Sequence, residues 1–226
     1  MAWSQLAILL SLGLLTLALA VLAARGIRRY AQGRVRVQLW WSLGLALASA
    51  AMAVETVVYA GILASGLLQA YVFLSGALVG VLSLGAVRVF RRPRLEPVYG
   101  TYILLASAVL AVACIATPLG PGMVTRGIIT GDPPLLLLAL SILITGPATV
   151  VLLTSAASSL RRSHDWRSLL LIAGALVLGA GGTLYIASFP VALYYAEFVG
   201  IVLLFAGLVS LRPVAPPAAV ARPAPA

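Results

Sequence analysis

The sequence contains no lysine, and it has a single histidine, His164, and a single cysteine, Cys114. Without lysine the chain cannot form a Schiff base, which excludes a conventional retinal or pyridoxal phosphate protein. One histidine and one cysteine provide neither a metal or haem site nor an internal disulfide. The serines between 153 and 159 have no histidine or lysine base at matching depth. We therefore expect no catalysis, no metal and no cofactor, and we interpret Cys114 as a small packing residue.

Charged residues are also scarce, at 9% of the chain, whereas hydrophobic residues make up 62%. Soluble domains have about 25% charged residues, and a water-soluble fold could not cover so much apolar surface. The composition therefore predicts an integral membrane protein, for which the bilayer is the solvent. In a soluble chain the net charge of +10 would suggest a nucleic-acid partner. Here we attribute it to cytoplasmic loops and expect no nucleic acid.

Long apolar stretches fill most of the remaining sequence. A membrane-spanning helix needs about 20 apolar residues, and the predicted spans cover residues 3–24, 38–62, 67–90, 99–117, 134–159, 167–187 and 190–211. We therefore predict an all-α polytopic membrane protein, with a seven-helix bundle over residues 1–211. The proline- and alanine-rich residues 212–226 have almost nothing to bury and are expected to form a disordered cytoplasmic tail.

The arginines determine the predicted orientation. Fourteen of the fifteen fall in the first, third and fifth loops and in the tail, and Arg126 alone falls on the opposite side. Because cytoplasmic loops are enriched in arginine, we expect the N-terminus outside and the C-terminus inside. Arginines follow the first span and do not precede it, which is the reverse of a signal peptide, so we expect that span to be retained. We place the protein in the cytoplasmic membrane of a prokaryote.

Spans one to three share landmarks with spans five to seven. A Trp-x-Ser-Leu sequence begins at Trp40 and at Trp166, and a Tyr-x-x-x-x-Gly sequence begins at Tyr71 and at Tyr195. Interfacial tryptophans are common in membrane proteins. The hypothesis of a duplication therefore depends on the tyrosine–glycine spacing and on the order in which the shared landmarks occur along the chain. Two parallel three-helix repeats joined by the fourth span would be similar in topology to the SWEET and PQ-loop transporters. The chain has no Pro-Gln pair.

Two of the five acids, Glu55 and Glu197, fall inside predicted spans. Each lies seven or eight residues, or roughly 10–12 Å, from the outer end of its span. A charge at this depth is costly unless it faces the bundle interior or water. Two carboxyl groups close together can share one proton. We therefore predict a protonatable site in the outer third of the membrane. The alternatives are hydrogen-bonded packing residues and an ion pair with Arg126.

Tyrosines and glycines complete the candidate site residues. Tyr59 and Tyr194 are one helical turn from Glu55 and Glu197, so they are predicted to line the site; an interfacial aromatic belt is the alternative. Gly76 and Gly80 have the GxxxG spacing that predicts close helix packing. Gly146 and Pro147 fall in the middle of the fifth span. Proline there frees a backbone carbonyl and predicts a kink or hinge; tolerated packing variation is the alternative.

These features favour a transporter of a small solute or ion, with lipid and a small solute or cation as its partners. The alternative is a non-transporting protein, either a sensor or an accessory subunit that packs against a larger membrane complex or a second copy. The similarity in layout to known transporters favours the first hypothesis. The short loops and the lack of a cytoplasmic output domain weaken a stand-alone sensor, but they leave an accessory subunit open.

Overall fold

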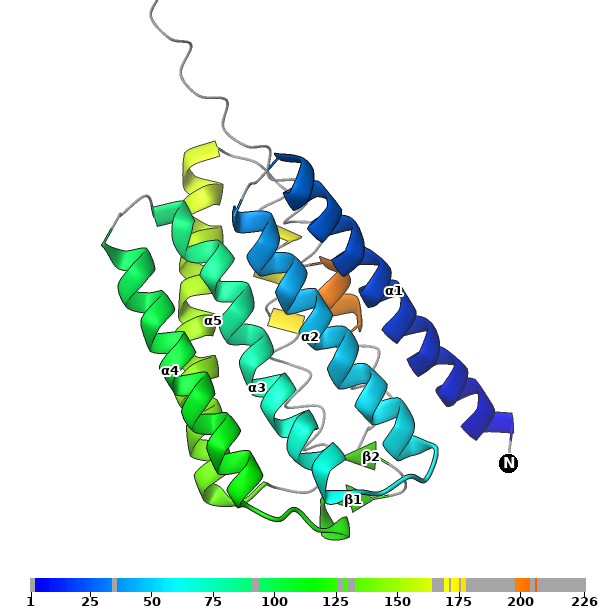
Figure 1. The fold of residues 1–226 in the computed structure, drawn as a ribbon. Coiled ribbons are helices and arrows are strands. Elements are labelled where there is room, and N and C mark those ends of the chain that lie inside the picture. The colour runs from blue at the N-terminus through cyan, green and yellow to red at the C-terminus, as the bar shows by residue number, and fades with distance from the viewer. Residues whose placement is uncertain are drawn as a thin grey trace, which may run out of the picture.

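Five long helices and the segments between them make up most of the computed structural model (Figure 1). The residues that the structure describes are 3–33, 36–90, 94–125, 128–129, 133–163, 169–170, 172–174, 176–177, 198–203 and 206. The helices are α1 Trp3–Gly33, α2 Arg36–Tyr59, α3 Ser65–Val87, α4 Leu95–Ala116 and α5 Leu135–Ser163. The shorter elements are the 3-10 helices η1 Arg88–Phe90 and η2 Pro121–Met123, and the strands β1 Val124–Thr125 and β2 Ile128–Ile129.

All five helices are long and apolar enough to cross a membrane. The described chain is therefore that of a helical, multi-pass membrane protein, as the composition predicts. The five helices coincide with the first five predicted spans. The sixth and seventh predicted spans, 167–187 and 190–211, lie largely outside the described residues, as does the tail over 212–226. Seven helices, the duplication and the orientation therefore remain predictions.

Helix α3 lies at the centre of the described helices. α2 packs between α1 and α3, and α3 also contacts both α4 and α5 (Figure 1). Close packing of this kind needs small side chains, because association in lipid depends on van der Waals contact between helices. The residues of α3 supply them: Gly76, Ala77, Gly80, Ser83 and Gly85 are all buried.

The two glycines of the GxxxG pair lie where α3 approaches α4 and α5. A Cβ atom added to Gly76 would come within 2.9 Å of Leu110 Cδ2, and one added to Gly80 would come within 2.9 Å of Ile144 Cγ2. Carbon atoms pack best at about 3.5–4.0 Å, so a larger residue would force the side chains of Leu110 and Ile144 to shift. The absence of a side chain at both positions is what allows the three helices to meet.

Helix α2 ends three residues earlier than the predicted span over 38–62. Gly61 has a φ of 97°, a left-handed conformation that glycine adopts without steric cost. The amide of Gly61 donates to the carbonyl of Val58, and that of Ile62 donates to the carbonyl of Val57. This pair of bonds is a Schellman motif, the usual glycine-dependent helix end. The helix stop is therefore Gly61, and not the later Ala-Ser-Gly sequence at 64–66.

The segment after α4 forms a folded cap where a plain loop was expected. β1 and β2 pair antiparallel, and β2 contacts α2. Leu119, Met123 and Ile129 are buried in one apolar cluster with Val58 of α2. The side-chain amide of Gln69 donates to the carbonyl of Thr117 at 2.9 Å, which ties the segment to the start of α3. We name residues 117–125 and 128–129 the outer cap, after the predicted orientation; they pack against the end of α2 and the start of α3.

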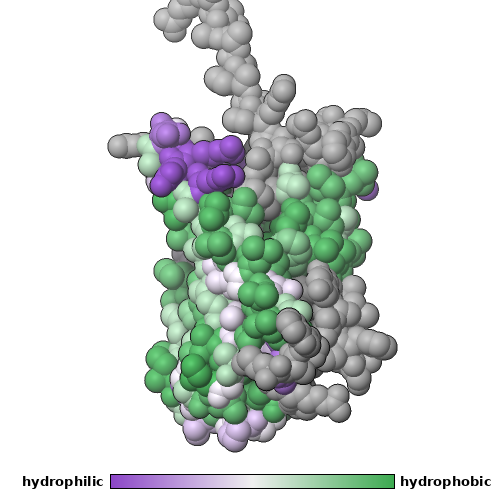
Figure 2. Space-filling model, turned by 90° about the vertical axis from the view of Figure 1, so that its right-hand side faces the viewer, coloured by the Kyte–Doolittle hydropathy of each residue, from purple (hydrophilic) through white to green (hydrophobic). Residues whose placement is uncertain are grey.

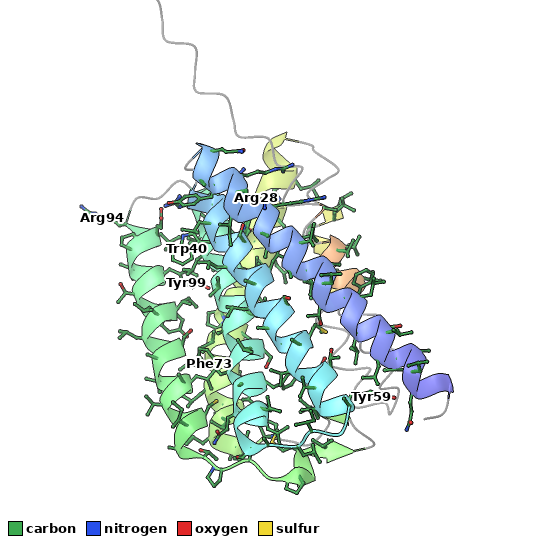
Figure 3. The ribbon with its side chains drawn as sticks, turned by 45° about the vertical axis from the view of Figure 1, so that its right-hand side comes forward. Arg28, Trp40, Tyr59, Phe73, Arg94 and Tyr99 are labelled. Atoms are coloured by element: carbon green, nitrogen blue, oxygen red, sulfur yellow. The ribbon has the colours of Figure 1, made fainter. Side chains whose placement is uncertain are left out.

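The helices alternate in direction, so the arginines of the described chain gather at one end. Figure 3 shows Arg28 and Arg94 at that end and Tyr59 at the other. The outer cap lies at the Tyr59 end, because it contacts the end of α2. The arginine end is the one that the positive-inside rule places in the cytoplasm.

Single cysteines in a Cys114→Ala background will test this orientation. Gly120→Cys and Gly122→Cys lie at exposed positions of the outer cap and should react with an impermeant maleimide added to intact cells. Arg28→Cys, exposed at the opposite end, should react only after the membrane is permeabilised. Met123→Cys should react slowly, because Met123 is 7% exposed. Labelling of Arg28→Cys in intact cells, with none at Gly120→Cys, would overturn the orientation.

Candidate functional site

Glu55 lies on the buried face of α2, four residues before the helix ends at Tyr59. The residue is 2% exposed. Ala51 and Met52 on one side and Val58 on the other are also buried, so the carboxyl group emerges from an apolar face. It is about 6 Å along the axis from the end of the helix, which is shallower than the sequence predicts because Gly61 stops α2 early.

The outer cap covers this end of α2. Val58, three residues after Glu55, belongs to the same apolar cluster as Met123 and Ile129 of the cap. The cap is itself held to α3 by two bonds: the Gln69 bond to Thr117, and a bond of 3.1 Å from the Leu119 amide to Ser65 Oγ. The carboxyl group is therefore one helical turn beneath a folded apolar cover.

The other predicted members of this site are placed only in part. Tyr59 is half-buried and packs against the apolar cluster formed by α1 and α2. Glu197 and Tyr194 lie outside the described residues, so the pairing of the two acids remains a prediction. Ile201, four residues after Glu197, is described: it is buried in the α1–α2 cluster together with Ala48 and Met52.

The predicted hinge contains a contact that the sequence does not indicate. Gly146 and Pro147 are both exposed on α5, and the helix continues through them. Proline lacks an N–H group, so the carbonyl of Leu143, four residues earlier, loses its helical donor. The hydroxyl of Tyr102 on α4 donates to this carbonyl. A neighbouring helix thus supplies the hydrogen bond that Pro147 removes, as membrane helices require.

A second polar contact joins α3 to α4 nearer the arginine end. Ser83 Oγ donates to the carbonyl of Gly80 at 2.6 Å, which uses its one hydrogen. The hydroxyl of Tyr99, 2.7 Å from Ser83 Oγ, therefore donates to the serine oxygen. The rings of Tyr99 and Tyr102 are 6.2 Å apart between centroids. Both tyrosines thus use their hydroxyl groups to join α4 to a neighbour, one to α3 and the other to α5.

An ion pair closes the same α3–α4 junction at the membrane edge. Arg88 Nε donates to Glu96 Oε1 at 2.8 Å, and the terminal guanidinium nitrogen contacts the same oxygen. Glu96 is in the first turn of α4, where the helix dipole favours a negative charge. Glu96 is therefore a structural acid at the surface, in contrast to the buried Glu55.

The described residues contain no group of three or more histidine, cysteine or acidic side chains that could hold a metal ion. Cys114 is buried in the apolar cluster of α3, α4 and the cap. What Glu55 can do chemically is gain and lose a proton or, when ionised, attract a cation. The expectation that the chain is not an enzyme stays a prediction.

The bond from Tyr102 to the carbonyl freed by Pro147 predicts that mutations at these two positions have non-additive effects on stability. Tyr102→Phe should lower the free energy of unfolding by about 1 kcal/mol, because the Leu143 carbonyl then has no donor. In a Pro147→Ala background the new amide at position 147 bonds that carbonyl, so Tyr102→Phe should cost much less. Unfolding of the four proteins in mixed micelles measures this coupling.

Tyr99→Phe is the matched control for this cycle, because its bond to Ser83 is independent of Pro147. It should cost the same with and without Pro147→Ala. Equal costs of Tyr102→Phe in the two backgrounds would show that Tyr102 does not compensate for the proline.

No family model, no curated protein and no solved structure matches this chain. No relative therefore offers a function to transfer. The placement of Glu55, the outer cap and the tyrosines of α4 is what guides the functional argument.

Proposed function

We propose that the protein is a membrane transporter of a small solute or ion, with a protonatable site at Glu55 in the outer part of the bilayer. The observation that carries the proposal is the burial of a carboxyl group within an apolar membrane-spanning helix. Ionisable residues in such helices are costly to insert and commonly mark ion pathways or proton relays.

The position of Ile201 supports a role for Glu197 beside Glu55. Ile201 is buried in one cluster with Met52, and Met52 is three residues before Glu55. In the predicted seventh span, which runs from outside to inside, Glu197 is four residues, or about one turn, to the outer side of Ile201. In α2, which runs the opposite way, Glu55 is about one turn to the outer side of Met52. Because Ile201 and Met52 belong to one buried cluster, we propose that the two acids lie at a similar level.

The outer cap supports an alternating-access mechanism. Because Glu55 is one turn beneath Val58, which packs with Met123 and Ile129, solute from outside reaches the carboxyl only when the cap or α2 moves. Transporters expose such a site to one side at a time by gating movements around it. We assign the cap, residues 117–125 and 128–129, as the outer gate of the proposed pathway.

One observation favours the rival function, an accessory subunit in which polar residues serve packing alone. Ser49, six residues before Glu55 on α2, donates to the carbonyl of Thr16 on α1 at 2.9 Å. Such interhelical hydrogen bonds stabilise membrane helix pairs by roughly 0.6–2 kcal/mol. If the protein is an accessory subunit, Glu55 serves packing in the same way as Ser49 on the same helix.

Proteoliposomes containing a pH-sensitive dye distinguish the two functions. With a panel of monovalent cations, sugars and amino acids as probes, the wild-type protein should couple uptake of one of them to proton movement. Glu55→Gln and Glu197→Gln should each abolish that coupling while changing thermal stability little, because an amide resembles the protonated acid. If the two acids act as a unit, the double variant should lose little more proton coupling than either single variant.

Glu96→Gln is the matched control, because it makes the same chemical change in an acid at the membrane edge. It should weaken the α3–α4 junction but leave proton coupling intact. The packing role would be supported, and the transport proposal contradicted, by two results together. The stability losses of Glu55→Gln and Glu197→Gln would be additive, and neither variant would change the transport of any probe.

A further inference from the structure

Helix α1 is longer than the membrane is thick. Its 31 residues span about 46 Å at 1.5 Å per residue, whereas the hydrocarbon core is about 30 Å thick. The excess lies at the arginine end of the bundle. Figure 2 shows strongly hydrophilic residues gathered at one end of the surface and mainly hydrophobic surface beyond them.

One exposed apolar stripe runs along α1. Leu10, Leu14, Leu17 and Val21 recur at intervals of three and four residues, and all four are exposed, so they share one face of the helix. Among the described helices α1 packs mainly on α2, and the residues of this stripe are exposed to the surroundings of the bundle. The stripe therefore marks where acyl chains lie against the helix.

Arginines continue the same face beyond the apolar stripe. Arg25 follows Val21 by four residues and Arg28 follows Arg25 by three; both are exposed, as is Arg29. A side chain on this face, just beyond the acyl-chain contact, lies at the level of the lipid headgroups. The geometry thus brings guanidinium groups to the phosphate of a lipid whose chains cover Leu17 and Val21.

No described acid balances the positive charges of these arginines, whereas Glu96 balances that of Arg88. Among the described residues, Arg25, Arg28 and Arg29 are in no ion pair, whereas Arg88 is paired with Glu96. α1 itself contains no acid. Like charges three and four residues apart on a helix repel one another, and a shared anion removes that repulsion. Guanidinium groups bind phosphate through paired N–H donors.

We infer that the cytoplasmic end of α1 binds the headgroup of an anionic phospholipid, with Arg25 and Arg28 as the main ligands and the acyl chains along Leu17 and Val21. This inference does not depend on the transport function. The partner is a lipid because the arginines extend a lipid-facing stripe. A free phosphate would have no need of the apolar half of the surface.

Spin-labelled phosphatidylglycerol and spin-labelled phosphatidylcholine, each in phosphatidylcholine vesicles containing the protein, measure this selectivity. The wild-type protein should immobilise the anionic lipid in preference to the neutral one. An arginine near an anionic surface contributes about fivefold in affinity, so Arg25→Gln with Arg28→Gln should reduce the preference roughly 25-fold. Thermal stability should stay unchanged, because both side chains are exposed.

Arg94→Gln with Arg161→Gln is the control, because it removes the same charge from exposed arginines at the N-cap of α4 and on α5. Figure 3 shows Arg94 at the same end of the bundle as Arg28. The control should keep most of the lipid preference. An equal loss of lipid preference in the two double variants would mean that the anionic lipid is attracted to the positive end of the protein in general and not to a site on α1. Unchanged preference in the α1 variant, or displacement of the lipid by inorganic phosphate, would also overturn the proposed site.

Discussion

The hydrocarbon core offers no hydrogen-bond partner, and this constraint governs every polar group in the described helices. Hydroxyl groups meet it locally in most cases: those of Thr16, Thr56 and Thr145 donate to the carbonyl four residues earlier in the same helix. In several other cases a neighbouring helix supplies the bond. Pro147 creates the clearest case, because it leaves the Leu143 carbonyl without a helical donor, and Tyr102 supplies one.

The same constraint gives Glu55 its significance. A hydroxyl group in a membrane helix can bond its own backbone at little cost, but a carboxylate carries a charge that apolar surroundings disfavour. Burial on α2 beneath a cap of apolar residues therefore needs a compensating reason. The proposed transport function would provide one, because a transport site is exposed to only one side of the membrane at a time.

Sequence reasoning captured what depends on composition and local chemistry. Hydropathy located the ends of the first five helices to within four residues, except that α1 continues to Gly33, nine residues beyond the predicted end. The chemistry of proline identified the freed carbonyl on α5. The spacing of Gly76 and Gly80 indicated a close helix approach, but not that Leu110 and Ile144 would be the neighbours. Those contacts depend on how helices far apart in sequence pack.

The errors have equally specific causes. The end of α2 was misplaced because Gly61 was read as part of the span, although glycine at a helix end is a known stop signal. Tyr102 was missed because it is 41 residues from Leu143, and no local pattern links them. The outer cap was missed because its burial comes from contacts with α2 and α3, not from its own short strands.

The most direct test of the account is the infrared absorption of the Glu55 carboxyl group in reconstituted protein. A protonatable site at Glu55 should give a protonated-carboxyl band that Glu55→Gln removes and whose amplitude changes reversibly with the pH outside the vesicle. That result would show an acid in communication with the outer solution. A Glu55 band that stays constant at every pH where the protein remains folded would contradict the account and leave Glu55 as a sealed packing residue.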